Sequence, residues 1–444
     1  MADGHMGVAS ISGLDDSFDT IIRTLPENFF RSGFSLLEPA ADAPDRDDQI
    51  HDPFTVLGRA RDAGVGVALR DGNGAYAGYK VRNVFLHDLS KPHAIALSHA
   101  AVSEIGSDRT RFINEGAYGA HGAAKGRTIN TFDGPDHRSL RRLFDTAIFG
   151  RARMDEWTTA ITLPTIEYLV ARVKRMIANG ETPDARRDLA LPAAYKSIST
   201  IIGIPQEDFT GFLERVMVIK DVERNPDAAK AGFSAFEGYF YEQMEERRTC
   251  PRADMVTIMG NTEVGGRKLT DEEIAKHCAF LLPGGIETTW PQTNNMILCA
   301  LMFSDQYRAL VEDPSLVDGF VEEAIRWAPS GFAAPRICAQ DTVVEGVEIP
   351  AGTGICSLSG VANRDPKVFE RPDDFNLRRD PNPHLTFHIG VHYCMGQNLA
   401  RYTLRTMLAT LARELPTLRF AGDRRELEAE AYGGRFAKRL LLTA

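Results

Sequence analysis

The sequence lacks the cysteine patterns of zinc and disulfide proteins. Its 444 residues include six cysteines, and no two of these cysteines form a Cys-x-x-Cys pair. Such pairs are typical of zinc sites, whereas disulfide frameworks belong to small secreted domains in oxidising compartments. We therefore expect free thiols, no structural zinc, and a cytoplasmic protein.

The chain also lacks a long apolar run and an excess of positive charge. Its longest apolar run, residues 296–303, is far shorter than the roughly 20 residues that a membrane helix needs. The N-terminus shows no charged segment followed by an apolar one, so no signal peptide is expected. The formal net charge of −10 disfavours nucleic acid and anionic membranes as partners. We expect a monomer that binds neither.

What remains is an ordinary globular composition, with 43% hydrophobic and 25% charged residues. A helical period dominates from residue 135 to about 326, and a last helix is expected over 397–414. Strand-like segments appear near 65–85 and over 336–358. The pattern predicts a mainly α protein with minor β structure contributed from both ends of the sequence.

Residues 387–396 form the most informative segment, FHIGVHYCMG. A helix is predicted to begin just after Cys394, so that unpaired N–H groups and the positive helix end face the sulfur. We expect this arrangement to lower the pKa of the thiol and favour the thiolate. Gly390 and Gly396 allow tight turns and close approach to a flat ligand. A lone cysteine is more often a small core residue, but Phe387 and His392 accompany this one.

The segment resembles the heme-binding loop of the cytochrome P-450 family, and the resemblance extends from about residue 50 onward. It implies the cytochrome P-450 fold, a triangular helical prism with small β-sheets, as one heme domain over 51–444 after an irregular N-terminal arm over 1–50. It also implies heme b (iron protoporphyrin IX), with Cys394 as the metal ligand and Phe387 and Gly396 among the cofactor contacts. His388 departs from the family pattern, which has glycine there.

A long helix is predicted from Thr270 to about Phe303. Thr270 and Glu273 have the spacing of a capping box at its start. Pro283 and Pro291 each remove a backbone donor inside it, so we expect the helix to bend or open between them. Taken alone, this segment could be a kink needed for packing.

The same helix contains Gly284 to Thr288, which resembles the family's Ala/Gly-Gly-x-Asp/Glu-Thr motif. The Thr288 hydroxyl can hydrogen-bond to the carbonyl of Gly284. The resemblance implies that Gly284 and Gly285 make room beside the heme. It also implies that Thr288 and Glu287 are catalytic, with Thr288 bonded to the oxygen being activated and Glu287 connecting it to solvent. Pro283 departs from the usual residue at its position.

Four basic side chains resemble the family's partners for the two heme propionates. His137 and Arg141 are four residues apart on a predicted helix and point the same way. Arg336 stands at the start of a predicted strand, and His392 lies in residues 387–396, the cysteine loop. Each alone would be interpreted as a surface charge.

Glu323 and Arg326 lie three apart on a predicted helix. By themselves they indicate a solvated surface pair, but their position matches the family's Glu-x-x-Arg motif. Arg379 resembles the second arginine of that cluster. The resemblance implies a buried structural cluster, Glu323, Arg326 and Arg379, that holds the cysteine loop on the helical core.

The resemblance implies a monooxygenase that inserts one atom of O2 into a small hydrophobic substrate of terpenoid, steroid or aromatic type. Electrons would come from an external ferredoxin, for which Arg138 and Arg142 offer a docking surface on an acidic protein. Substrate contacts are expected from the 113–130 loop and from four residues that are mostly small or apolar, namely Phe280, Gly284, Phe332 and Ala333.

Two alternatives stay open from the sequence. The chain could be a heme-thiolate binding or sensor protein without turnover, although an acid–alcohol pair such as Glu287 and Thr288 is not needed for binding. It could also be driven by peroxide, or desaturate its substrate instead of hydroxylating it.

Overall fold

The computed structural model describes residues 37–39, 53–70, 76, 79–81, 91–118, 122, 126–220, 226–331, 333–427 and 439–444. The predicted N-terminal arm lies outside the described residues, apart from the short strand β1 (Leu37–Pro39). Phe332, predicted to contact substrate, also lies outside them.

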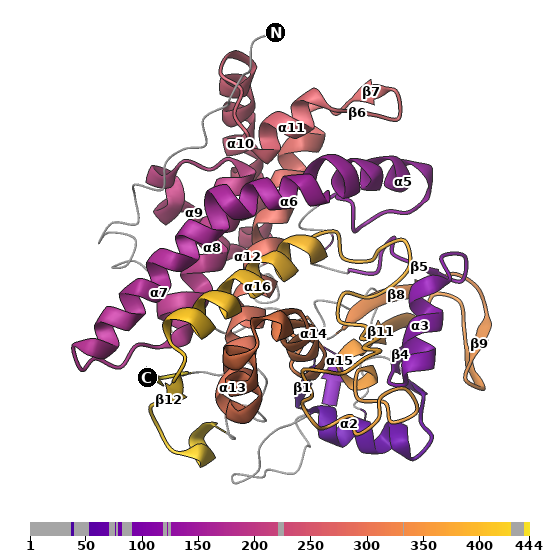
Figure 1. The fold of residues 1–444 in the computed structure, drawn as a ribbon. Coiled ribbons are helices and arrows are strands. Elements are labelled where there is room, and N and C mark those ends of the chain that lie inside the picture. Colours follow the sequence, from indigo (N-terminus) through magenta and orange to yellow (C-terminus); the bar gives the residue numbers. More distant parts are fainter. Residues whose placement is uncertain are drawn as a thin grey trace.

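Helices make up most of the molecule (Figure 1). In chain order they are α2 (Pro53–Asp62), α3 (His99–Ser107), α5 (Gly134–Leu143), α6 (Arg151–Trp157), α7 (Leu163–Ala178), α8 (Leu191–Ile202), α9 (Phe209–Lys220), α10 (Pro226–Thr249), α11 (Met255–Asn261), α12 (Asp271–Met302), α13 (Ser304–Glu312), α14 (Val317–Trp327), α15 (Ser359–Ala362) and α16 (Gln397–Glu414). The last helix has the bounds predicted from the sequence.

Helix α12 runs through the centre of the helical part and packs against α8, α10 and α16. Its capping box is confirmed: Thr270 Oγ1 accepts from the N–H of Glu273 at 3.2 Å, and Glu273 Oε2 accepts from the N–H of Thr270 at 2.8 Å. The helix continues through Pro283 and Pro291, so it does not open between them as the sequence allowed, and a bend there stays a prediction. Packing on three neighbouring helices outweighs a loss of about 3 kcal/mol per interior proline.

The largest of the small sheets lies on one side of the molecule (Figure 1). The largest has the strand order β2-β4-β11-β8-β5, in which β4 and β11 are parallel and the other neighbours antiparallel. Its strands come from both parts of the sequence, as predicted: β2 (Val67–Arg70), β4 (His93–Ala96), β5 (Phe112–Ile113), β8 (Ala334–Cys338) and β11 (Gly354–Ser357).

The remaining described strands form two-stranded antiparallel pairs. These are β1 with β3 (Tyr79–Val81), β6 (Glu263–Val264) with β7 (Arg267–Lys268), β9 (Thr342–Val344) with β10 (Val347–Ile349), and β12 (Arg419–Phe420) with β13 (Leu442–Thr443). No helix among the described residues is long and apolar enough to cross a membrane.

The apolar core divides along α12. The first half of α12 packs with α5, α8 and α10 around Phe144, Tyr195 and Trp290. Its second half packs with α7, α14 and α16. Residues 280–289, in the first half of α12, line a cavity, and this is where the sequence predicts the functional site.

Candidate functional site

A cavity of about 320 Å³ lies between α12, α8, the start of β8 and the loop before α16. It brings together most of the residues predicted for the site: His137, Arg141, Phe280, Gly284, Gly285, Thr288, Ala333, Arg336, Phe387, His392, Cys394 and Gly396. Glu287 is buried on α12 but does not line the cavity. The sequence therefore predicted residues from four separate segments that meet at one place.

Cys394 lies in the loop that leads into α16, with Gly396 as the N-cap residue of that helix. Its thiol lies deep in the protein but faces the cavity, so it is accessible from there. Burial raises the pKa of the Cys394 thiol, although the backbone N–H groups of Gly396 and Gln397 and two nearby arginines act to lower it. The helix end thus lowers this pKa as predicted, but burial outweighs it, so the predicted net direction is wrong. A thiolate here requires a cationic partner in the cavity.

The cysteine loop is closed by a hydrogen bond from the N–H of Cys394 to the carbonyl of Phe387, at 2.9 Å. Gly390 has a φ of 81°. A Cβ at Gly390 would lie 2.1 Å from the carbonyl oxygen of Gly106 at the end of α3. The glycine is required for packing of the loop against α3.

Gly284 and Gly285 on α12 differ in what they face. A Cβ on Gly284 would meet no atom within 4 Å, whereas one on Gly285 would lie 2.9 Å from Cδ1 of Ile198 on α8. Gly284 thus leaves open space along the cavity, and Gly285 also allows α12 and α8 to approach closely.

The Thr288 hydroxyl donates to the carbonyl of Gly284 at 2.9 Å, the bond expected from the sequence. Ser330 adds a contact that the sequence did not predict: its hydroxyl donates to the carbonyl of Thr288 at 2.9 Å. The N–H of Ser330 donates to Oε1 of Gln292 at 2.8 Å. These bonds tie the segment before β8 to the cavity-lining turn of α12.

Arg336 is a buried cation on β8, only 4% exposed. Among the described residues, its guanidinium donates to the carbonyl of Pro335 at 2.8 Å and forms no ion pair with a carboxylate, although the charge of Asp133 acts on it. Burial lowers the pKa of Arg336. Because a buried charge is costly unless it is paired, this guanidinium requires an anion in the cavity.

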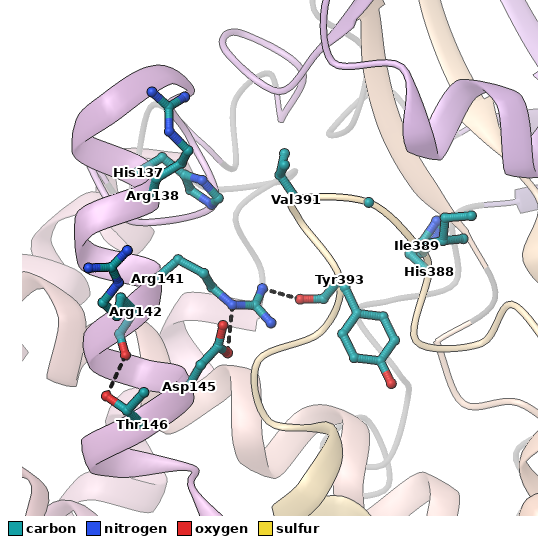
Figure 2. Close-up of a pocket in the computed structure, with 11 residues that line it drawn as sticks. His137, Arg138, Arg141, Arg142, Asp145, Thr146, His388, Ile389, Val391 and Tyr393 are labelled. Atoms are coloured by element: carbon teal, nitrogen blue, oxygen red, sulfur yellow. Dashed lines mark hydrogen bonds and ion pairs between the residues drawn. The ribbon is translucent and has the colours of Figure 1, made fainter.

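His137 and Arg141 both lie on α5, one turn apart, and both line the cavity. Arg141 Nε donates to Asp145 at 2.8 Å, and a second nitrogen donates to the carbonyl of Tyr393, beside the cysteine (Figure 2). The His137 and His392 rings are 4.2 Å apart. Burial, together with the charge of His392, lowers the pKa of His137 to about 4, so that its ring is neutral at neutral pH.

Asp133 is a residue of the site that the sequence did not predict. Its Oδ1 accepts from His392 at 2.7 Å, and its Oδ2 accepts from the N–H groups of Asn114 and Glu115. Burial alone would raise the pKa of Asp133, but these hydrogen bonds hold it below its ordinary value. The signal available was an aspartate at the start of a predicted helix, which suggests a helix cap rather than a partner for His392.

The residues that line the cavity fit a heme. The Cys394 sulfur is a suitable ligand for iron. Arg336 is an unpaired buried cation for a propionate. The open space beside Gly284 leaves room at the edge of α12.

Comparison with known proteins supports this interpretation. The model of the cytochrome P-450 family matches residues 308–416. A biotin biosynthesis cytochrome P-450 of Bacillus subtilis (strain 168) is 34% identical over 65% of this chain and 72% of its own. A steroid C26-monooxygenase of Mycobacterium tuberculosis (strain CDC 1551 / Oshkosh) is 32% identical over 66% and 78%. The crystal structure of a cytochrome P-450 with an acyl carrier protein ligated to hexadec-9Z-enoic acid has a TM-score of 0.74 at 27% identity, covering 88% and 98%.

The chain belongs to the cytochrome P-450 family. The resemblance and the fold class predicted from the sequence are confirmed, and the chain is a cytochrome P-450 monooxygenase whose family implies heme iron. Residues 308–416 include α14, α16 and the cysteine loop.

In this cytochrome P-450, α14 carries the predicted ion-pair cluster, and the structure brings its three members together. Arg326 donates to both oxygens of Glu323 at 2.8 Å, and Arg379 Nε lies 3.1 Å from them. Glu323 and Arg326 are completely buried. The N–H of Asn376 and the amide of Asn382 donate to the same carboxylate, so every charge in the cluster has partners.

The neighbouring Glu322 forms a second cluster, which the sequence did not predict. Its carboxylate accepts from Arg401 on α16 at 2.6 and 2.9 Å and contacts His384 Nε2 at 3.0 Å. The Arg401 guanidinium also lies 4.6 Å from the ring centre of Phe387. Burial would raise the pKa of Glu322, but the bonds from His384 and Arg401 hold it at about 2.

Proposed function

We propose that this cytochrome P-450 binds heme b through Cys394 and inserts one atom of O2 into a small hydrophobic substrate, with electrons from an external ferredoxin. Residues 51–444 would form the single heme domain. The observation that carries the proposal is the single cavity lined by Cys394, Thr288 and Arg336. Cys394 offers a sulfur ligand, Thr288 offers a hydroxyl in the Gly284 to Thr288 motif, and Arg336 offers a cation that forms no ion pair among the described residues.

The proposal gives each side chain a role. Bound heme supplies the redox chemistry that activates dioxygen. Cys394 holds the iron, and the propionates are bound by Arg336 with help from His137, Arg141 and His392.

Proton delivery is assigned to α12. The Thr288 hydroxyl, which donates to the Gly284 carbonyl in this structure, would leave that carbonyl to donate its proton toward the cavity that it lines. Glu287, buried on the same turn and not among the cavity-lining residues, supplies a proton to Thr288 in turn. Ser330 is a positioning residue, because it holds the backbone carbonyl of Thr288.

The apolar part of the cavity supports a neutral hydrophobic substrate of terpenoid, steroid or aromatic type. Predicted contacts Phe280, Gly284 and Ala333 line it, together with Asn114, Tyr118, Ile129 and Asn130 from the 113–130 loop. The sequence did not predict further apolar side chains from α8 and nearby elements: Phe149, Ile198, Ile201, Ile202, Met255 and Leu281. A relative named as a steroid C26-monooxygenase fits this substrate class.

A surface hollow of about 660 Å³ supports the choice of an acidic electron donor. It lies between α5 and the cysteine loop, and Figure 2 shows Arg138 and Arg142 on the α5 side. Tyr393, next to the proposed iron ligand, lines the same hollow. An acidic iron–sulfur protein that docks there would approach the heme from the cysteine side.

The decisive experiment is the difference spectrum of the reduced protein with carbon monoxide. Wild type and Cys250→Ser, which changes an exposed cysteine that does not line the cavity, are expected to show a strongly red-shifted Soret band. Cys394→Ser is expected to lose the band. A band at the histidine-ligated position in wild type, or an unchanged band in Cys394→Ser, would contradict the proposal.

The same preparation separates the two alternatives. Product formed with O2, a ferredoxin and its reductase supports the monooxygenase. A sensor gives no product under any of these conditions, whereas a peroxide-driven enzyme gives product with hydrogen peroxide alone.

A further inference from the structure

His388 occupies a backbone conformation that favours glycine. Its φ is 56°, in the left-handed region that L side chains rarely adopt. Its backbone N–H donates to the carbonyl of Leu385 at 2.9 Å, so the turn itself is satisfied without any contribution from the side chain. Nothing in the local backbone therefore explains a histidine here, and the imidazole must be considered for its own contacts.

His388 lines both the proposed heme cavity and the surface hollow. Although the residue as a whole is partly exposed, its Nε2 is enclosed and has no hydrogen-bond partner among the described residues. An enclosed polar atom without a partner is costly. A group that binds in the cavity could supply the missing partner of Nε2.

The neighbour of His388 indicates which group that is. The ring interacts electrostatically with Arg336, the buried guanidinium that has no carboxylate partner in the described part of the chain. Burial, and to a lesser extent Arg336, lowers the pKa of His388 to about 3, so the ring is neutral at neutral pH. A neutral imidazole can donate one N–H, and a single carboxylate could satisfy both His388 and Arg336.

We propose that His388 donates a hydrogen bond from Nε2 to the heme propionate that Arg336 binds. This inference rests on the proposed heme binding and adds a cofactor contact that glycine at this position cannot make. The contact compensates for the unfavourable backbone conformation of His388 once heme is bound. It also connects the hollow assigned to the electron donor with the edge of the heme.

The test compares heme retention in wild type, His388→Phe and His388→Gly. Phenylalanine keeps a ring without a donor, and glycine relieves the backbone. Heme transfer from the ferric protein to excess apomyoglobin is expected to be faster in both variants, on the order of 10- to 100-fold, because a bond to a charged acceptor is lost. Val391→Ala, which lines the hollow but not the cavity, should transfer heme at the wild-type rate.

A second measurement identifies the bond itself. The propionate bending bands in the resonance Raman spectrum should shift in both His388 variants and stay in place in Val391→Ala. If His388→Phe does not fold, heme transfer and the propionate bands of His388→Gly alone test the proposal. Unchanged bands and heme transfer, with the thiolate carbon monoxide band intact, would overturn this inference and leave the proposed function standing. Absence of that band in wild type would overturn both.

Discussion

Two groups of buried side chains near the cysteine loop differ in whether their polar and charged atoms are paired within the protein. In the closed cluster of Glu323, Arg326 and Arg379, the carboxylate and both guanidinium groups have hydrogen-bonded partners from the protein. In the open pair of Arg336 and His388, a cation has no anion and a ring nitrogen has no acceptor among the described residues. Protein interiors tolerate buried charge when it is paired, so the first group is complete by itself and the second requires a ligand.

The largest effect expected from this difference is in Glu323→Ala. Removing the carboxylate leaves two buried guanidinium groups without their anion, which costs roughly 3–5 kcal/mol of unfolding free energy. We expect insoluble or heme-free protein, measured as soluble yield and heme content. Asp318→Ala is the matched control, because Asp318 on the same helix forms an exposed pair with Arg405 at 2.7 Å. That loss should be below about 1 kcal/mol. Normal heme incorporation in Glu323→Ala would show that the cluster is not structural.

Arg336→Met should show that the open pair, unlike the closed cluster, does not stabilise the heme-free protein. Replacing an unpaired buried cation by an apolar side chain of similar length removes a desolvation cost. We therefore expect the heme-free protein to unfold at the same or a higher denaturant concentration than wild type. Heme transfer to apomyoglobin should become faster, on the order of 10- to 100-fold, as the propionate loses its cation.

Arg326→Met is the comparison that makes this result specific. The same change in the closed cluster is expected to destabilise the heme-free protein, because Glu323 loses its principal partner. If Arg336→Met destabilises the heme-free protein as much as Arg326→Met does, Arg336 already has a partner in the protein and the comparison fails.

Contacts between residues that are close in the sequence could be predicted from it. Glu323 and Arg326 are three residues apart, and the capping box of Thr270 and Glu273 is equally local. Short spacings on a helix specify such contacts directly. The cysteine loop, the Gly284 to Thr288 motif and the propionate ligands came from the family pattern.

Contacts between distant segments escaped prediction. Asp133 and His392 are 259 positions apart, and Glu322 and Arg401 are 79 apart. No periodicity connects residues so far apart; only the packing of α5 and α14 against the cysteine loop and α16 does. The pKa of Cys394 was predicted in the wrong direction for a related reason. Its helix end could be located from the sequence, but the depth of burial that outweighs it could not.

The smallest expected effect concerns the second cluster, Glu322 with His384 and Arg401. It tests whether this cluster, like that of Glu323, holds its carboxylate charged through partners in the protein. The pKa of Glu322 is about 2 in the folded protein against 4.5 for an ordinary glutamate. A lowered folded pKa contributes stability that is fully present above the unfolded value and is lost as the pH falls from about 4.5 toward 2.

We therefore expect Glu322→Gln to unfold with a shallower dependence on acid than wild type. Between about pH 6 and about pH 3.5, wild type should lose about 1 kcal/mol more than the variant, measured by urea unfolding at both values. The exposed pair of Asp318 and Arg405 provides the control, since Asp318→Asn should leave the acid dependence close to that of wild type. Equal acid dependence in Glu322→Gln and wild type would mean that Arg401 and His384 do not hold this carboxylate in its charged form. The link between α14 and the helix that follows the cysteine would then be held by packing alone.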